Sequence, residues 1–339
     1  MHRSLYFTAP REVAVRQDET RPPGPGEMTI RATCSAISAG TEMLLYRGEM
    51  EQGSKLDDVI PSLQGTCQHP FKYGYSTVGR VVAAGKGVSC DWLGKTVFAF
   101  HSHEEVFNIA ASDAIAVPPG IREEDAVMLP SMETALSLTM DAAPLVGEFV
   151  VVLGQGVIGL LTTSVLSRFP LARLITADRY ETRRVRSVEM GADVSLDPMM
   201  KVASFLESAG LPSSKADLVF ELSGRPEALE YATHLAGMEA RIVVGSRYGQ
   251  KAAAGCLGDD FHRQRLRVLS SQVSNIDGSL SRRWTKTRRL EMAWRLIRAV
   301  TPSRLITHRF NIADAAEAYR LLDESGEKAI QILLTYPEE

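Results

Sequence analysis

Three glycines with the spacing G-x-G-x-x-G carry the clearest chemical signal in this sequence. Gly154, Gly156 and Gly159 follow directly after the apolar run FVVVL and directly before LLTTSVL. A strand that turns sharply into a helix directs backbone N–H groups and the positive end of the helix dipole at one point, which suits a pyrophosphate. We expect Gly154 to make the tight turn, Gly156 to admit the phosphates and Gly159 to let helix and strand pack closely. The same turn contains Gln155, Val157 and Ile158.

Asp178 ends the next apolar run, LITAD, at the distance expected for a residue that binds a ribose. Its carboxylate can accept hydrogen bonds from the 2′-hydroxyl, and its charge repels a 2′-phosphate, so the sequence favours NAD over NADP. Arg179 follows at once, and Arg183 and Arg184 lie on the next turn. A pocket that tolerates the 2′-phosphate of NADP therefore stays open on charge grounds.

A second glycine-containing stretch, GSRYG at residues 245–249, ends a later apolar run. Ligands of open α/β sheets collect at the carboxyl ends of strands, so Ser246 and Arg247 are expected near the cofactor. The alternative is a plain connecting loop.

The strands and helices around these residues are predicted from the order and spacing of the apolar runs. Between about residues 131 and 275, apolar runs alternate with helical patterns, which predicts βαβ crossovers and a parallel sheet. The runs are FVVVLG, ARLITAD, ADVSL, ADLVFELS, ARIVVGS and LRVLSSQ. Earlier residues form short strand-like runs divided by turn signals, and later ones predict helices at about 285–299 and 312–322 and a closing strand, AIQILLTY. The sequence thus predicts a mainly β domain, 1–130 with 276–339, and an inserted α/β domain, 131–275.

Charge and composition exclude several classes of partner. The chain has 339 residues, with 38 Lys and Arg against 41 Asp and Glu, and a net charge of -3 gives no broad positive field for nucleic acid or a membrane surface. The long uncharged stretch 149–167 contains the glycine turn and reads as strand and helix rather than a membrane span. The charged N-terminus does not resemble a signal peptide, so we expect a cytoplasmic protein with a small-molecule substrate.

The cysteines and histidines suggest no metal or disulfide framework. Four cysteines lie far apart without a C-x-x-C pair: Cys34, Cys67, Cys90 and Cys256. The pairs Cys67–His69 and His101–His103 could each present two ligands from one strand face, but their spacing matches no metal motif that we can justify. No metal site is predicted.

Taken together, these residues resemble the medium-chain dehydrogenase/reductase family, the superfamily of zinc-type alcohol dehydrogenases and quinone reductases. The likeness covers nearly the whole chain, through PPGPGEMTIRA, GTEMLLYRG, GYSTVGRVVAAGKGV, LGKTVFAF, GQGVIG and ITHRFNIADAAEAYRLL. It implies a GroES-like, mainly β catalytic domain split around a Rossmann domain, hydride transfer in the cleft between them, and a homo-oligomer, either a dimer or a tetramer.

The zinc ligands of the family do not carry over. In ISAGTE, Ser38 and Ala39 stand where zinc members have a Cys before the Gly-Thr-Asp motif, and Tyr75 stands where they have the His of Gly-His-Glu. The third ligand position falls near Pro130. The chain therefore resembles a zinc-lacking branch that includes bacteriochlorophyllide dehydrogenases, which oxidise a hydroxyethyl group with NAD. Nothing in the sequence selects a chlorin over a sugar, a polyol or a biosynthetic intermediate.

Without zinc, hydride transfer needs an acid/base and hydrogen-bond donors from the protein. His101 titrates near working pH and is the natural base, with Tyr75 or Thr41, the hydroxyl of the family's proton relay, as donor to the substrate oxygen. A structural histidine or tyrosine is the alternative reading.

Four further residues are assigned by their place in the family's motifs. Ser38, Glu42 and Glu133 are expected at the substrate pocket, although either carboxylate could instead cap a helix or carry surface charge. Thr134, in METAL, resembles the residue that meets the nicotinamide.

The leading hypothesis is a zinc-independent, NAD-linked oxidoreductase acting on a secondary alcohol or its carbonyl. The runner-up is a zinc-free NADPH-dependent reductase of quinones or enones, which Asp178 disfavours. A third hypothesis is a non-catalytic nucleotide-binding protein that kept the fold alone.

Overall fold

The chain folds into two units, which the structure, a computed structural model, describes over residues 1–57, 60, 63–251 and 258–337. Cys256 lies outside the described residues. One unit comprises Met1–Pro130 and Ile297–Glu339, here called unit 1, and the other, unit 2, comprises Ser131–Leu296. The sequence places the second boundary after residue 275, whereas in the structure unit 2 continues to Leu296. One reason is that Arg289 hydrogen-bonds to Ser137 within unit 2.

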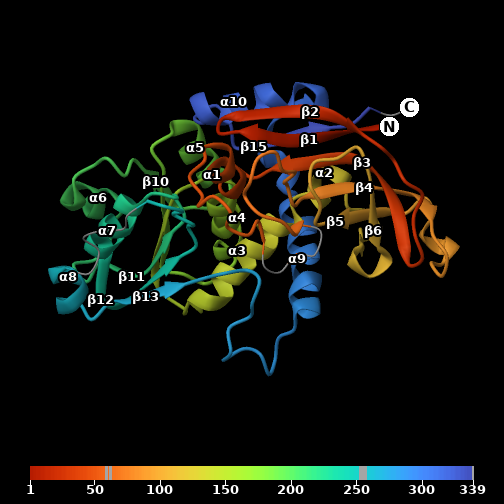
Figure 1. The fold of residues 1–339 in the computed structure, drawn as a ribbon. Coiled ribbons are helices and arrows are strands. Elements are labelled where there is room, and N and C mark those ends of the chain that lie inside the picture. Colours follow the sequence, from red (N-terminus) through yellow and green to blue (C-terminus); the bar gives the residue numbers. More distant parts are fainter. Residues whose placement is uncertain (58–59, 61–62, 252–257, 338–339) are drawn as a thin grey trace. The chain divides into compact units, whose positions relative to one another are not determined.

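The six apolar runs between residues 149 and 272 form the six strands of one parallel sheet in unit 2, as predicted. The strands are β8 (Phe149–Leu153), β9 (Arg173–Ala177), β10 (Val194–Leu196), β11 (Ala216–Glu221), β12 (Ala236–Val244) and β13 (Arg267–Ser270). Their spatial order is β10-β9-β8-β11-β12-β13, so successive strands are added on one side of β8 as far as β10 and then on its other side from β11 onwards. This is the strand order of a doubly wound dinucleotide-binding sheet. Figure 1 labels β10, β11, β12 and β13 of this sheet.

Both faces of this sheet are covered, which is why its strands are apolar throughout. Alternate residues of β8 enter opposite cores: Val151 and Leu153 pack in one cluster, and Val150 and Val152 in the other. The helices of unit 2 are α4 (Val157–Leu166), α5 (Glu181–Glu189), α6 (Val202–Ser208), α7 (Pro226–Leu235) and α8 (Asp259–Arg263). Two longer helices, α3 (Leu129–Ala142) and α9 (Lys286–Val300), contain the points where the chain passes from one unit to the other.

Unit 1 is mainly β, as predicted. Its strands are β1 (His2–Ala9), β2 (Glu12–Asp18), β3 (Glu27–Ile37), β4 (Thr77–Ala84), β5 (Thr96–Ala99), β6 (Val106–Ala110), β7 (Ile115–Ala116), β14 (Ile306–Asn311) and β15 (Gln331–Thr335). One sheet has the order β14-β15-β3-β4-β5-β7, with β6 also on β3, and β1 pairs with β2 as a separate hairpin. Because β15 pairs with β3, the C-terminal segment completes the sheet that the N-terminal segment begins.

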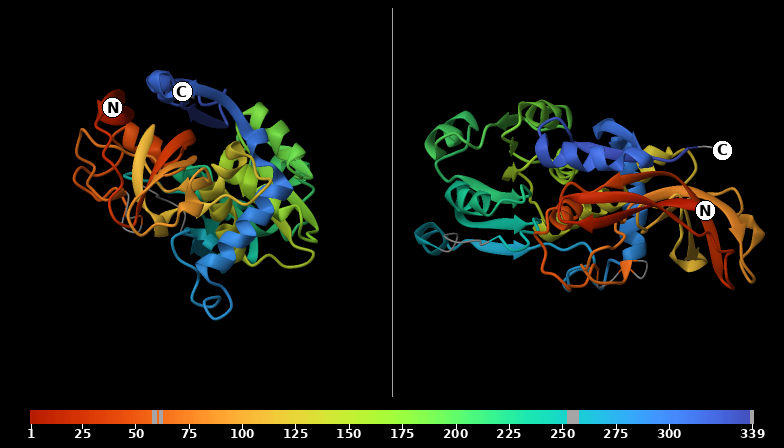
Figure 2. Two further views of the ribbon diagram at one scale, coloured as in Figure 1. Left: turned by 90° about the vertical axis from the view of Figure 1, so that its right-hand side faces the viewer. Right: turned by 45° about the horizontal axis from the view of Figure 1, so that its top comes forward.

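Unit 1 also contains short helices. They are α1 (Thr41–Tyr46), α2 (Glu123–Ala126) and α10 (Ala315–Glu324), with single 3₁₀ turns at η2 (Cys90–Trp92), η3 (Ala111–Asp113), η4 (Pro302–Leu305) and η5 (Ile312–Asp314). α10 lies beside β2 (Figure 2). Tyr319 of α10 packs edge-on against Phe7 of β1, so the C-terminal helix and the first hairpin share one core.

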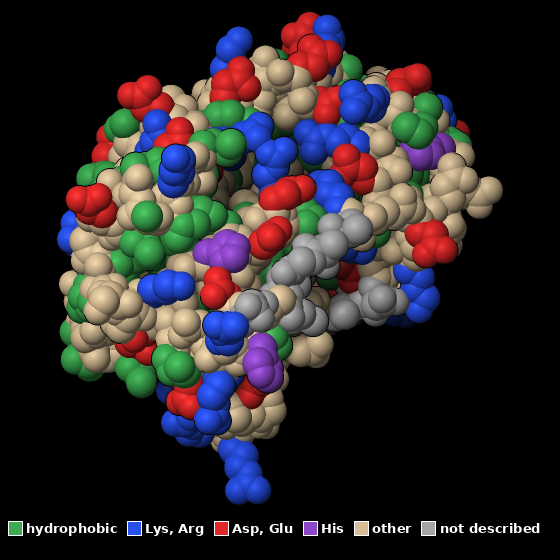
Figure 3. Space-filling model, turned by 90° about the vertical axis from the view of Figure 1, so that its left-hand side faces the viewer, with side chains coloured by type: hydrophobic (Ala, Val, Ile, Leu, Met, Phe, Trp, Pro, Cys, Tyr) green, Lys and Arg blue, Asp and Glu red, His purple; other side chains and the backbone are tan. Residues whose placement is uncertain are grey.

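Two features of the structure agree with the near-balance of charges in the sequence and with the interpretation of residues 149–167 as strand and helix. Basic and acidic side chains are interspersed over the face drawn in Figure 3. Among the described residues, no helix combines the length and the apolar character needed to cross a membrane.

Candidate active site

The glycine turn between β8 and α4 has the geometry that its spacing predicts. Gly154 has a φ of +92°, and a Cβ there would lie 2.7 Å from the backbone of Leu222 and Ser223. A Cβ on Gly159 would lie 1.9 Å from the carbonyl oxygen of Gly154, so helix and strand touch at that point. A Cβ on Gly156 would meet only Nη1 of Arg183, at 3.9 Å. The space beside Gly156 is therefore open, as a cradle for phosphate requires.

Asp178, directly after β9, is tied to this turn. One carboxylate oxygen accepts a hydrogen bond from the backbone N–H of Gln155 at 2.8 Å, and the other accepts from the N–H of Tyr180 at 2.8 Å. The residue is only 7% exposed. The carboxylate thus lies beside the turn, held by two backbone donors that fix its orientation.

Three arginines surround Asp178. Nη1 of Arg183 lies 4.0 Å from its carboxylate, and Nη1 of Arg184 donates to its carbonyl oxygen at 2.8 Å. The guanidinium groups of Arg179 and Arg183 lie 5.0 and 4.9 Å from the ring centroid of Tyr180. Arg183, which the sequence suggests only as a contact to a 2′-phosphate, is thus also the cation nearest to Gly156.

The other residues predicted at the cofactor have mixed surroundings. The buried side chain of Gln155 turns inward, where its Oε1 accepts from Thr163 at 3.0 Å, and Val157 and Ile158 begin α4. Ser246, just after β12, accepts from the N–H of Gly224 at 2.9 Å and so links the loops after β11 and β12. Arg247 is exposed.

Thr134 and Glu133 lie in α3, within unit 2. Glu133 is 8% exposed, and its Oε1 lies 3.5 Å from Nε of Arg289, which is itself 4% exposed. Burial raises the pKa of Glu133 and outweighs the charge of Arg289. The carboxyl group predicted at the substrate pocket is therefore paired with a buried arginine of its own unit. Thr134 is partly exposed.

Unit 1 brings three predicted hydroxyl residues together where β3 gives way to α1. The hydroxyl of Tyr75 donates to Oγ of Ser38 at 2.8 Å, and the backbone N–H of Thr41 donates to the same oxygen at 3.2 Å. Burial raises the pKa of Tyr75 to about 12, although hydrogen bonds with Ser38 and Thr41 oppose that shift. Tyr75 is therefore a proton-bearing donor at neutral pH.

Glu42 lies behind this hydroxyl cluster, in contact with a histidine that the sequence did not assign to the site. Its Oε1 accepts from the N–H of Ser38 at 2.8 Å, and its Oε2 lies 3.0 Å from Nε2 of His103 and accepts from the hydroxyl of Tyr319. Nδ1 of His103 lies 2.7 Å from Oγ of Ser35. Glu42 and His103 are fully buried, so Glu42 holds Ser38 from the inside rather than lining a pocket.

His101 lies on a neighbouring segment and has different contacts. Its ring stacks on Phe107, with centroids 3.9 Å apart, and its Nδ1 is 3.2 Å from the carbonyl oxygen of Ser102. A carbonyl accepts but cannot donate, so this contact places the proton on Nδ1 and leaves Nε2 with a lone pair. Burial lowers the pKa of His101, although Glu104 opposes that shift, so the ring is neutral at pH 7.

The strand register relates His101 to the hydroxyl cluster. β4 and β5 pair Thr77 with Ala99, and the N–H of His103 donates to the carbonyl oxygen of Tyr73 further along the same two segments. This register sets Tyr75 and His101 opposite each other. Opposed residues of antiparallel segments have Cα atoms about 4.5–5.5 Å apart.

A cavity of about 410 Å³ opens beside His101 within unit 1. Its lining includes Leu56, Leu63, Phe71, Lys72, His101 and Glu104. The exposed amides of Gln64 and Gln68 also face it. The lining therefore combines apolar side chains with several hydrogen-bonding groups and one neutral imidazole.

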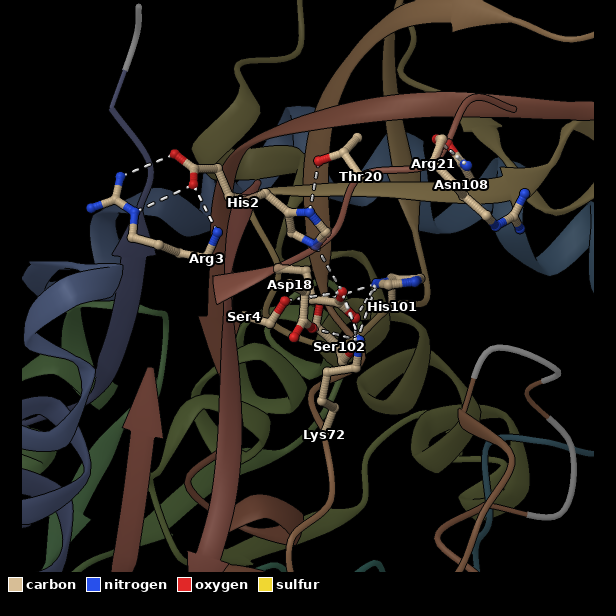
Figure 4. Close-up of polar contacts among 12 residues, drawn as sticks. His2, Arg3, Ser4, Asp18, Thr20, Arg21, Lys72, His101, Ser102 and Asn108 are labelled. Carbon is tan, nitrogen blue, oxygen red and sulfur yellow. Dashed lines mark hydrogen bonds and ion pairs between the residues drawn. The ribbon is translucent and has the colours of Figure 1, made fainter. Parts of the chain in front are cut away.

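A cluster of polar side chains next to His101, among them His2, Asp18 and Lys72, could not be predicted from the sequence (Figure 4). Nζ of Lys72 lies 2.9 Å from Glu104 and 3.3 Å from Asp18. Burial alone would raise the pKa of Glu104, but His2, His101 and Lys72 together hold it well below its usual range. Ligand atoms of His2, Asp18 and Glu104 lie within 4.8 Å of one another, yet the Lys72 ammonium already supplies the positive charge there.

The histidine and cysteine pairs of the sequence do not converge. His101 and His103 have the separate partners described above, and His69 lies against Phe71, with ring centroids 5.1 Å apart. Cys67 is buried, and burial raises the pKa of its thiol.

Sequence comparisons find proteins that are similar to this chain over almost its whole length. The starvation-sensing protein RspB of Escherichia coli (strain K12) is 24% identical over 358 residues, covering 99% of this chain and all of that protein. D-guloside 3-dehydrogenase of the same strain is 25% identical over 351 residues, covering 98% of this chain and all of the relative. No family model matches the chain.

The fold is also found among solved structures. The crystal structure of an E. coli CFT073 alcohol dehydrogenase, rspB, complexed with NADH superposes with a TM-score of 0.78 at 21% identity, covering 98% of this chain and 99% of the other. The predicted fold class, a GroES-like β domain with a Rossmann domain, is confirmed.

The buried Glu104 cluster gives a prediction for stability. Glu104→Gln removes the charge that pairs with Lys72, and we expect the free energy of unfolding at pH 7 to fall by about 3 kcal/mol. The folded pKa of Glu104 is lower than its ordinary value of 4.5, so its contribution is complete above that pH and is lost as the pH falls through the folded pKa.

Urea denaturation of both proteins between pH 3 and pH 7 measures this difference. Glu105→Gln is the matched control, because the side chain of Glu105, which pairs with Arg3, is more exposed than that of Glu104 (17% against 6%) and should matter by less than about 1 kcal/mol. Equal losses in the two variants would contradict the prediction.

Proposed function

We propose that this chain is a nicotinamide-dependent dehydrogenase of the medium-chain family, acting on a secondary alcohol or its carbonyl without zinc. The observation that carries the proposal is the turn at Gly154–Gly159, open beside Gly156 and fixed to Asp178. A purely structural turn needs neither an open cradle nor a buried carboxylate at the end of the next strand. The relatives named as dehydrogenases support the same conclusion.

The residues of unit 2 fit a dinucleotide. Gly156 and the start of α4 would receive the pyrophosphate, with Arg183 beside it, and Asp178 would accept the ribose hydroxyls. The bound nicotinamide would supply the hydride acceptor or donor. The carboxylate of Asp178 carries the negative charge that disfavours a 2′-phosphate. Arg183 lies 4.0 Å from that carboxylate, and Arg184 donates to the backbone carbonyl of Asp178. This arrangement supports NAD as the cofactor.

Hydroxyl groups take the place of a metal in this proposal. Ser38 and Tyr75 carry hydroxyl groups at the positions where the sequence lacks zinc ligands, and neither Ala39 nor Pro130 can bind a metal through its side chain. A hydrogen-bond donor stabilises a developing oxyanion when it is fixed in advance, and the hydroxyl of Ser38 is fixed by the hydrogen bonds that it accepts from Tyr75 and Thr41.

His101 would act as the base. In the direction of oxidation, Nε2 of His101 would accept the hydroxyl proton of the alcohol and pass it to solvent, while a bound nicotinamide would take up the hydride. The products are a carbonyl compound, NADH and a proton. The tautomer set by the Ser102 carbonyl leaves Nε2 able to accept that proton.

The cavity beside His101 supports a polyhydroxylated substrate. Gln64, Gln68 and Lys72 can each bond to hydroxyl groups, while Leu56 and Phe71 give apolar contact. A volume of about 410 Å³ accommodates a hexose-sized molecule with a substituent. D-guloside 3-dehydrogenase is named for such a substrate. A cytoplasmic homo-oligomer completes the proposal.

Turnover with and without metal removal tests the function. We expect the purified protein to reduce NAD with at least one member of a panel of glycosides, hexitols and vicinal diols, followed by NADH absorbance. Activity should be unchanged after dialysis against a chelator, with metal content measured in parallel. NADH binding without turnover on any panel member would contradict the enzymatic proposal. If the chelator removes one equivalent of zinc per chain and the activity is lost at the same time, the zinc-free mechanism is contradicted.

Cofactor choice depends on the charge of Asp178. We expect NADH to bind more tightly than NADPH, as measured by the quenching of protein fluorescence. Asp178→Asn keeps an oxygen acceptor for the turn but loses the charge, so the ratio of the NADPH Kd to the NADH Kd should fall about tenfold. Asp113→Asn, at an exposed site in unit 1, is the control. Tighter binding of NADPH by the unaltered protein would reverse the assignment.

The pH profile reports on His101. Alcohol oxidation requires the neutral ring, so kcat/KM should rise with pH through the pKa of His101, which lies below the ordinary 6.5, and then level off. His101→Asn should lower kcat about 10²-fold to 10⁴-fold and remove that rise. A variant that keeps the inflection would show that another group is the base.

A further inference from the structure

The hydroxyl of Ser38 has an unusual balance of hydrogen bonds. A serine oxygen has two lone pairs and one hydrogen. Both lone pairs are engaged, one by the hydroxyl of Tyr75 at 2.8 Å and the other by the backbone N–H of Thr41 at 3.2 Å. Only the hydrogen is left to bond.

That hydrogen has no acceptor in the described part of the chain. Ser38 is partly exposed, and the next residues, Ala39 and Gly40, are exposed, so this stretch of unit 1 reaches the surface. The two donors to Oγ also restrict where its O–H can point, because an oxygen with both lone pairs engaged directs its hydrogen to the remaining tetrahedral position.

The backbone of Ser38 is held as firmly as its side chain. Its N–H donates to Oε1 of Glu42 at 2.8 Å, and Oε2 of Glu42 lies 3.0 Å from Nε2 of His103. Glu42 and His103 are both fully buried. A Cβ on Gly74 would lie 2.7 Å from the His103 ring, so only glycine allows the histidine to approach this closely.

We propose that the hydroxyl of Ser38 is the hydrogen-bond donor to the reacting oxygen of the substrate, and that Glu42 is its positioning residue. This inference rests on the proposed function. It assigns to Ser38 the donor role that the sequence suggested for Tyr75 or Thr41, because the hydrogen of Tyr75 is spent on Ser38 itself. The donor binds the oxygen as negative charge develops there, and no proton needs to leave Ser38.

Ser38→Ala, Ser38→Thr and the control Ser112→Ala, at an exposed serine, test the donor role. With the best substrate of the panel, we expect Ser38→Ala to lower kcat about 10²-fold to 10³-fold, the loss typical for one oxyanion donor. NADH affinity should not change, and Ser38→Thr, which keeps a hydroxyl, should retain most of the activity. If Ser38→Ala does not fold, Ser38→Cys, with its weak S–H donor, should show the same direction of effect.

A double-mutant cycle tests the positioning role. Glu42→Gln keeps an acceptor for the Ser38 N–H but weakens the contact with His103, so it should lower kcat about tenfold in the unaltered protein. In the Ser38→Ala background it should have almost no further effect, since a residue that acts through Ser38 has nothing left to position. A purely structural role would give additive losses.

The outcomes separate the two proposals. If the unaltered protein turns over no panel substrate, the proposed function fails, and this inference fails with it. If the unaltered protein is active and Ser38→Ala is equally active, only the donor role of Ser38 is overturned. Additive effects of Glu42→Gln and Ser38→Ala would overturn the positioning role of Glu42.

Discussion

A carboxyl group and an imidazole buried against each other, Glu42 and His103, are the constraint on which unit 1 depends. Neither side chain reaches water, so each polar atom needs a partner within the protein. Those partners come from Ser38 after β3, Ser35 within β3 and Tyr319 in α10. Leaving one such buried group unsatisfied costs about 1–3 kcal/mol, so the residues near 40, near 103 and near 319 are held to one arrangement. The hydroxyl cluster inherits its geometry from that requirement.

In unit 2, too, a buried carboxyl group holds a segment of backbone in place. Asp178 is almost fully buried, and its two oxygens are engaged by the N–H groups of Gln155 and Tyr180. A carboxylate at the end of β9 thereby fixes the turn after β8, whose strand lies beside it in the sheet. In both units an interior carboxyl group positions a backbone segment, and the segment presents its groups outward. Rigidity beneath a site lets hydrogen-bond donors act without reorganisation when a ligand arrives.

How far the sequence predicts this structure depends on whether the signal is local. The strands of unit 2 were predicted because each is a short apolar run between helical patterns, and the glycine turn because its residues are neighbours. The pairing of Glu42 with His103 joins residues 61 positions apart, and that of Lys72 with Glu104 joins residues 32 apart. No periodic pattern marks such contacts. The ion pair of Glu133 is equally hard to predict, because its partner Arg289 lies in a different helix, far along the sequence.

The protonation states divide the proposed chemistry between two groups. Tyr75, with a pKa raised to about 12 by burial, keeps its proton at neutral pH and can only donate, so it orients Ser38 and cannot serve as the base. His101, with a pKa lowered by burial, has an unprotonated Nε2 at the same pH and can only accept there. Tyr75 and His101 lie on the segments that adjoin β4 and β5, between the Thr77–Ala99 pair and the hydrogen bond from His103 to Tyr73. Zinc performs both tasks by withdrawing charge from the substrate oxygen and making its proton easier to remove. A neutral hydrogen-bond donor withdraws less charge from the substrate oxygen than zinc does, so without a metal the hydroxyl proton needs a separate acceptor. Nε2 of His101 meets that need, while Tyr75 keeps its own proton and orients Ser38.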